Sequence, residues 1–107
     1  MSKIAMIITS TAVSGKRDEL FDLYLEHLAP RAEENPGQEL VVWCADQQNP
    51  EVFHLFEIYA DGETLGANAQ ASWFADYMAV AMPLLAGEPS VSMAEPRWSK
   101  GTGSSGL

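Results

Sequence analysis

The stretch EVFHLFEIYA, residues 51–60, decides the fold class of this chain. β-Branched and aromatic residues fill it and neither Gly nor Pro interrupts it, so it predicts a β-strand. Successive side chains of a strand point to opposite faces of the sheet. One face carries Val52, His54, Phe56 and Ile58, and the other carries Phe53, Leu55, Glu57 and Tyr59. Because both faces are largely apolar, we expect both to be covered.

Two further strands and a helix are predicted upstream of this stretch. Residues 38–46 form a second run of strand-forming residues, close enough to pair with 51–60 as a hairpin. Residues 3–11 predict another strand. Between them, after a possible cap at Ser14, apolar residues recur at helical spacing and predict one apolar helix face: Leu20, Leu23, Tyr24 and Leu28. We expect a kink or a stop near Pro30 and the end of the helical stretch at 35–37.

The downstream half predicts a second helical region and a last strand. Asp61 is a candidate cap for a helical stretch over about 63–85, with a joint at 71–72 and Ser72 capping the second piece. Residues 90–98 predict an edge strand, because Pro96 cannot donate to a ladder. The element order is βαββαβ, which predicts an α+β, ferredoxin-like fold with an antiparallel sheet and helices on one face. The apolar second face then predicts a homodimer in which sheet packs on sheet.

Composition limits the class of protein and its partners. The chain has 107 residues, six Lys and Arg, 15 Asp and Glu and a formal net charge of −9, which argues against nucleic acid and anionic membrane surfaces as partners. We expect one domain over residues 1–98 and a disordered, Gly/Ser-rich tail over 99–107. The single Cys44 excludes an internal disulfide framework. With no targeting or membrane-spanning segment predicted, we expect a cytoplasmic protein.

No cofactor or metal site is predicted. Residues 101–106 spell G-x-G-x-x-G, but no helix follows them to receive a phosphate, so we expect no nucleotide there. His27 and His54 stand in no metal-ligand spacing. His54, in the middle of its strand, is better explained as a hydrogen-bonded core or interface residue than as a catalytic base.

Glu57 is the candidate for chemistry that the residues themselves point to. A carboxylate between Phe56 and Ile58 should be partly buried, which raises its pKa unless it is paired. Arg97 or Lys3 on a neighbouring strand would neutralise it, and we rank this structural pair above a general base in a pocket. Tyr59 shares its face. Asn68, Trp73 and Tyr77 lie on the second helical region, where aromatic residues one turn apart more often belong to a core than to a ligand site.

Residues 53–78, FHLFEIYADGETLGANAQASWFADYM, resemble the antibiotic biosynthesis monooxygenase (ABM) domains. The signature of these small, dimeric α+β-barrel proteins is a strand ending in Glu-x-Tyr or Glu-x-Trp, a short turn, Ala-His, and then a serine and a phenylalanine. The opening of the chain also fits, with Gly-Lys-Arg-Asp-Glu-Leu at the helix start and then Glu-Asn-Pro-Gly. The resemblance covers residues 3–98. The chain departs from it at Asn68 and Trp73, where the family often has histidine.

The resemblance implies a monooxygenase, an oxidoreductase that lets dioxygen react with a deprotonated quinol or polyketide-like aromatic without flavin or metal. Glu57 would then take the proton, Asn68 and Tyr59 would orient the small aromatic substrate, and Trp73 and Tyr77 would form an aromatic wall. Two alternatives stay open: a non-catalytic small-molecule-binding or accessory protein on the same fold, and an isomerase of a small metabolite. The missing histidines favour the binding protein.

Overall fold

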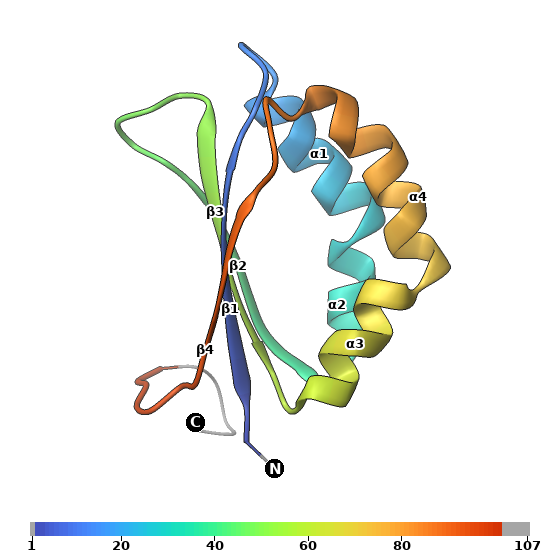
Figure 1. The fold of residues 1–107 in the computed structure, drawn as a ribbon, viewed down its shortest axis with the longest axis vertical. Coiled ribbons are helices and arrows are strands. Elements are labelled where there is room, and N and C mark those ends of the chain that lie inside the picture. The colour runs from blue at the N-terminus through green and yellow to red at the C-terminus, as the bar shows by residue number, and fades with distance from the viewer. Residues whose placement is uncertain (1, 102–107) are drawn as a thin grey trace.

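One antiparallel sheet and one layer of helices make up the part of the chain that the structure describes (Figure 1). The computed structural model describes residues 2–101. Its elements in chain order are β1 (Ile4–Thr11), α1 (Arg17–His27), α2 (Ala29–Glu34), β2 (Gln38–Ala45), β3 (Val52–Tyr59), α3 (Gly62–Gln70), α4 (Ser72–Ala81), the 3₁₀ turn η1 (Met82–Leu84) and β4 (Ser90–Ala94). The strand order β2-β3-β1-β4, with every pair antiparallel, confirms the ferredoxin-like α+β fold.

The ends of the helices follow from local backbone chemistry. Asp61 caps α3 as predicted, because its carboxylate accepts a 2.8 Å hydrogen bond from the backbone N–H of Thr64. The two predicted serine caps are wrong. Ser14 precedes Gly15, whose positive φ of 79° turns the chain before α1 begins, and Ser72 is already the first residue of α4. The stop near Pro30 is confirmed, since α1 ends at His27 and Pro30 lies in the first turn of α2.

The inner face of the sheet, which faces the helices, carries the core. Ile8, Leu55 and Trp43 lie opposite one another across three strands, and Leu55 is buried. The ring of Trp43 stacks on Phe53 with 4.8 Å between centroids. Leu20 of α1 is 1% exposed against this surface. The predicted helix face over 20–28 therefore packs on the predicted sheet face.

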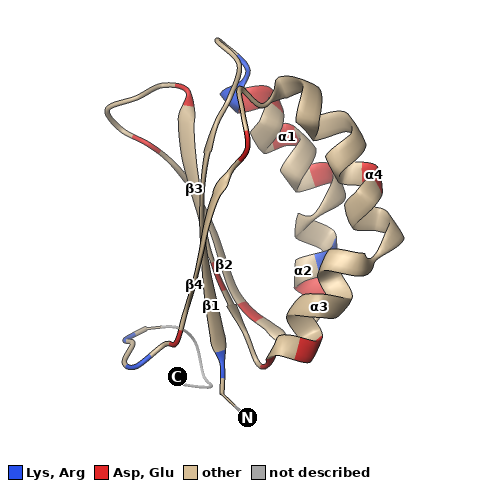
Figure 2. Ribbon diagram, viewed as in Figure 1, with Lys and Arg blue, Asp and Glu red and all other residues tan. Residues whose placement is uncertain are grey.

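The outer face of the sheet has no helix over it within residues 2–101 (Figure 1). Ile7, Phe56 and Val42 form one row across β1, β3 and β2, and 37%, 41% and 41% of their surfaces are exposed. The charged residues gather on the helices and towards the strand ends (Figure 2). His54 also lies on this face, where Nδ1 is 3.0 Å from the Thr9 hydroxyl and Nε2 is 2.9 Å from an oxygen of Asp46. The predicted hydrogen-bonded histidine is confirmed.

The last strand lies at an edge, as predicted, because β4 pairs with β1 alone among the described strands. It ends at Ala94, four residues before the predicted boundary at 98. Residues 102–107, most of the predicted tail and of the G-x-G-x-x-G stretch, lie outside the described residues. None of the helices within residues 2–101 is long and apolar enough to cross a membrane.

Candidate functional site

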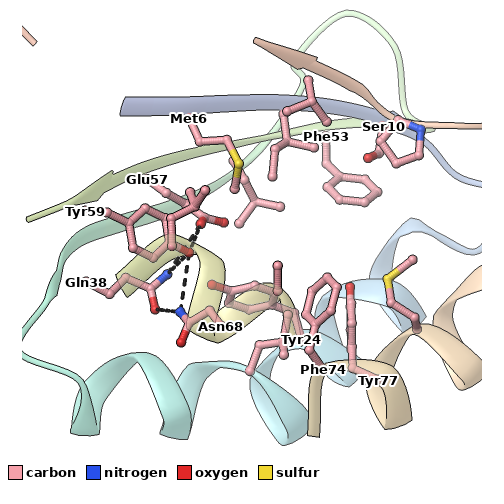
Figure 3. Close-up of a pocket in the computed structure, with 18 of the residues that line it drawn as sticks. Met6, Ser10, Tyr24, Gln38, Phe53, Glu57, Tyr59, Asn68, Phe74 and Tyr77 are labelled. Atoms are coloured by element: carbon pink, nitrogen blue, oxygen red, sulfur yellow. Dashed lines mark hydrogen bonds between the residues drawn. The ribbon is translucent and has the colours of Figure 1, made fainter. Parts of the chain in front are cut away.

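A cavity of about 310 Å³ lies between the inner face of the sheet and the helices (Figure 3). All four strands contribute to its sheet side, β4 through Val91, and α1, α3 and α4 form its helix side. The five residues to which the family resemblance assigned roles all lie on the wall of this cavity: Glu57, Tyr59, Asn68, Trp73 and Tyr77. The face of β3 that carries Glu57 is therefore the cavity face, and the face of His54 points away.

Glu57 is the acidic residue on the wall, and it is only 7% exposed. Burial raises the pKa of its carboxyl group, and the hydrogen bond from Tyr59 opposes part of that rise. The Tyr59 hydroxyl donates to Oε1 at 2.6 Å, and Gln38 Nε2 donates to the same oxygen at 3.4 Å. The other oxygen, Oε2, has no hydrogen-bond partner among residues 2–101, although Glu57 lines the cavity. One oxygen is held by the protein and the other is open to the cavity.

The predicted ion pair of Glu57 with Lys3 or Arg97 is wrong. Lys3 pairs with Glu39, and Arg97 pairs with Glu95 at 2.9 Å. The sheet register explains the difference, because Met6 of β1 and Val41 of β2 lie opposite Glu57. Lys3 precedes β1, and Arg97 follows the end of β4, so neither reaches the middle of the inner face. The carboxyl group is buried with neutral hydrogen-bond donors only.

Gln38 and Asn68 complete the hydrogen-bond network around the Glu57–Tyr59 pair, drawn as dashed lines in Figure 3. Asn68 Nδ2 donates to Gln38 Oε1 at 3.1 Å and to the Tyr59 hydroxyl at 3.5 Å. Its own carbonyl oxygen accepts from Asn35 Nδ2 at 3.3 Å. Asn68 is thus bonded to protein groups on both ends of its amide. It positions Tyr59.

Sequence reasoning missed Gln38, which lies at the first position of β2. The preceding Gly37 lets the start of β2 lie close to α3, because a Cβ on Gly37 would approach the Thr64 side chain to 2.7 Å. The Gly37 carbonyl also accepts a 2.7 Å hydrogen bond from Ala60, just beyond β3. The hairpin register places Gln38 opposite Tyr59, and this pairing was the feature of the sequence that could have identified Gln38 as a site residue. A polar residue paired with a cavity-facing residue lies on the same face.

Aromatic side chains form much of the helix side of the cavity. Tyr77 is 8% exposed and lies beside Phe74, with 6.4 Å between ring centroids. The guanidinium of Arg31 lies 5.6 Å from the ring centroid of Trp73, a cation–π distance. Tyr24 of α1, predicted as part of an apolar helix face, also lines the cavity. Burial is the largest cause that raises the pKa of both Tyr24 and Tyr77, and the negative charge of Glu57 raises it further.

This arrangement suits a reaction or a binding event in which one proton is taken up in an apolar enclosure. A carboxyl group with a raised pKa is a stronger base once it is ionised. The aromatic and aliphatic wall excludes water and favours a ligand with an apolar body. Among residues 2–101 no group of three or more His, Cys, Asp or Glu side chains is placed to hold a metal ion.

The same architecture occurs in solved structures of other proteins. A "putative antibiotic biosynthesis monooxygenase" from Chloroflexus aurantiacus is 24% identical, with 95% of this chain and 100% of that chain covered and a TM-score of 0.82. One of the same name from Caulobacter crescentus is 22% identical, with 90% and 91% covered and a TM-score of 0.84. A Nitrosomonas europaea protein of unknown function is 26% identical, with 94% of each chain covered and a TM-score of 0.77. The fold is ABM-like.

No family model matches the chain, and no curated protein matches its sequence. The two proteins named as ABM monooxygenases are 24% and 22% identical to this chain, and at this identity the similarity shows a shared fold. It extends over nearly all of each chain, so it includes both layers that enclose the cavity.

Proposed function

We propose that this ABM-like protein is a cofactor-independent monooxygenase that oxidises a small, electron-rich aromatic molecule, a quinol or polyketide-like phenol, with dioxygen. One observation carries the proposal: Glu57 is buried in an apolar cavity with one carboxyl oxygen bonded to Tyr59 and Gln38 and the other open to the cavity. The names of two proteins of the same fold support it.

The first step is removal of a phenolic proton. A phenol whose hydroxyl lies at Oε2 of Glu57 would donate its proton there, because Oε1 is already occupied. The Tyr24 hydroxyl has no hydrogen-bond partner among residues 2–101 and would donate to the phenolate oxygen as charge develops on it. Tyr59, Gln38 and Asn68 would hold the carboxyl group in place through their network.

The second step is the reaction of the phenolate with dioxygen in the apolar cavity. A ring carbon that bears hydrogen and is conjugated to the phenolate forms a bond to dioxygen, and the peroxide takes back the proton held by Glu57. The O–O bond of this hydroperoxide and the C–H bond of the same carbon then break, so that water leaves and a carbonyl group remains. One oxygen atom stays on the carbon and the other leaves in water. The substrate supplies all four electrons, so the balance needs no further reductant. The cavity contributes by excluding bulk water and orienting the ring.

A non-catalytic small-molecule-binding protein is the second candidate, and Asn68 favours it. The amide of Asn68 donates to Gln38 and Tyr59 and accepts from Asn35, so it offers no free donor to a substrate oxygen. A carboxyl group and aromatic wall would still bind a phenol. In this reading the cavity selects a ligand and no oxygen is consumed.

We also propose that two copies of the chain pair through their outer sheet faces. The row of Ile7, Phe56 and Val42 is apolar and about two-fifths exposed, and no described helix covers it. A two-fold axis through this row would bury the same surface on both copies. We expect the interface to exceed about 1,000 Å², the lower bound for a stable contact.

Oxygen uptake distinguishes the two candidate functions. A panel of quinols would be presented to the protein in chelator-treated buffer, with ligand binding measured in parallel by calorimetry. Uptake above the rate of spontaneous oxidation supports the monooxygenase. Binding across the panel without uptake supports the binding protein.

A further inference from the structure

Three hydroxyl groups on the cavity wall have no hydrogen-bond partner among residues 2–101. They belong to Ser10 of β1, Tyr24 of α1 and Tyr77 of α4, whose exposed fractions are 5%, 6% and 8%. No buried polar atom of the described residues is closed off without a partner, so these hydroxyls reach the cavity space. They contrast with the bonded network of Gln38, Tyr59 and Asn68.

A ligand that leaves a buried hydroxyl group without a hydrogen-bond partner binds more weakly than one that supplies a partner. Apart from these hydroxyls and the Glu57 network, the wall is apolar, so the ligand that fills the cavity decides whether the three hydroxyls find partners. A purely hydrocarbon ligand would leave all three hydroxyls unbonded. A ligand with oxygen atoms at matching places would satisfy them and gain specificity.

The hydroxyls are spread along the cavity. The register pairs Met6 with Glu57 and Ser10 with Phe53, so Ser10 lies four residues along β1 from the position opposite Glu57. At about 3.4 Å per residue this separation is about 14 Å. In Figure 3, Tyr24 lies beside the Glu57 network, and Tyr77 and Ser10 lie towards the other end of the cavity.

We infer that Tyr77 and Ser10 form a second polar subsite, which donates hydrogen bonds to a carbonyl oxygen at the end of the ligand remote from Glu57. The ligand class is then an elongated hydroxyaryl ketone, with a phenol at one end and an acceptor at the other. The inference rests on the proposed function only for the phenol at Glu57. Tyr77 and Ser10 are specificity-determining residues, and Glu57 is the base.

The test compares three ligands of one shape class in binding assays under argon, so that oxidation plays no part. The probes are 6-acetyl-2-naphthol, its analogue with ethyl in place of acetyl, and acetylnaphthalene without the hydroxyl. The ratio of acetyl to ethyl affinity reports the second subsite, and the effect of removing the hydroxyl reports the phenol site of Glu57 and Tyr24. One recovered hydrogen bond predicts an acetyl preference of about tenfold in the wild-type protein.

Tyr77→Phe and Ser10→Ala remove single unpartnered oxygen atoms and leave the packed side chains in place. Each should lower the acetyl-to-ethyl ratio, and the double variant should bring it to about one, with the preference for the phenol unchanged. Ser14→Ala, an exposed hydroxyl before α1, is the matched control and should keep the wild-type ratio. Thermal unfolding confirms that each variant is folded.

Three results would overturn the inference: no acetyl preference in the wild-type protein, a preference that survives in the double variant, or no binding of any probe at millimolar concentration. The proposed function is tested separately. If the protein consumes no oxygen but shows both binding preferences, the monooxygenase proposal fails and the second subsite stands. If it consumes oxygen and prefers the phenol but shows no acetyl preference, the second subsite fails and the monooxygenase proposal stands.

Discussion

The hydroxyl of Tyr59 donates a 2.6 Å hydrogen bond to Oε1 of Glu57, two residues earlier on the same face of β3. This contact fixes which carboxyl oxygen is engaged and leaves Oε2 towards the cavity. It also lowers the pKa of Glu57, against the larger rise caused by burial. The strand periodicity that brings the two residues together therefore also sets the basicity of the site.

Removing that hydroxyl should make Glu57 harder to ionise. We predict that Tyr59→Phe raises the pKa of Glu57 further, because a hydrogen bond to the ionised form is lost, and that it costs about 1–2 kcal/mol of folding free energy. Carbon NMR of the labelled carboxyl group measures the first effect and urea unfolding the second. An unchanged titration midpoint would show that the bond does not control the ionisation of Glu57.

The free energy of unfolding should depend on pH through the ionisation of Glu57. Its folded-state pKa lies above the value of 4.5 for an ordinary glutamate. The folded state therefore holds the proton more tightly, and this contribution to stability is present below pH 4.5 and is lost as the pH rises through the folded-state pKa. We predict that the unfolding free energy of the wild-type protein, minus that of Glu57→Gln, falls with rising pH in that range. A flat or rising difference in urea titrations would contradict it.

The proposed dimer should depend on the apolar row of the outer sheet face. We predict that Phe56→Lys or Val42→Lys gives a monomer in equilibrium sedimentation, because each places a charge in the middle of the contact. Val80→Lys is the control: Val80 is 43% exposed, like Phe56 and Val42, but it lies on α4 in the helix layer. A wild-type monomer at micromolar concentration, or a dimer unaffected by Phe56→Lys, would remove the sheet-on-sheet arrangement.

The packing of α1 on the sheet should dominate the stability of the helix layer. Leu20 is 1% exposed, and we predict that Leu20→Ala costs about 2–5 kcal/mol through lost burial and the cavity it leaves. Leu25→Ala, on the same helix but 48% exposed, should cost far less. Urea unfolding of both variants measures the difference. Equal losses would mean that α1 is not anchored through Leu20.

Periodicity and local chemistry were enough to predict the fold. The alternation over 51–60 set both faces of β3, and the Asp61 cap, the break near Pro30 and the edge position of β4 followed from the chemistry of single residues. The predicted serine caps are wrong because an N-cap needs a specific backbone geometry at one position, and the sequence is compatible with several starting positions for each helix. Gly15, with its positive φ, shifted the start of α1 to Arg17.

The site was only partly predictable, because its contacts depend on register. The pairing of β1 and β2 with β3 put Met6 and Val41, and no cation, opposite Glu57. It also brought Gln38 to Tyr59, which no motif marks. Tyr24 looked like a core residue because helical spacing shows which side of a helix is buried. It does not show whether a buried hydroxyl meets protein or a cavity.

The most direct test of the account is oxygen uptake by the wild-type protein and by Glu57→Gln, with Glu33→Gln, an exposed carboxylate on α2, as the control. With a quinol that binds, we predict uptake by the wild-type protein and Glu33→Gln that rises with pH as Glu57 and the phenol lose their protons. Glu57→Gln should be slower by about 10²-fold or more, because it keeps the size of the side chain and removes the base. Equal uptake by Glu57→Gln and the wild-type protein would contradict the claim that this carboxyl group accepts the proton.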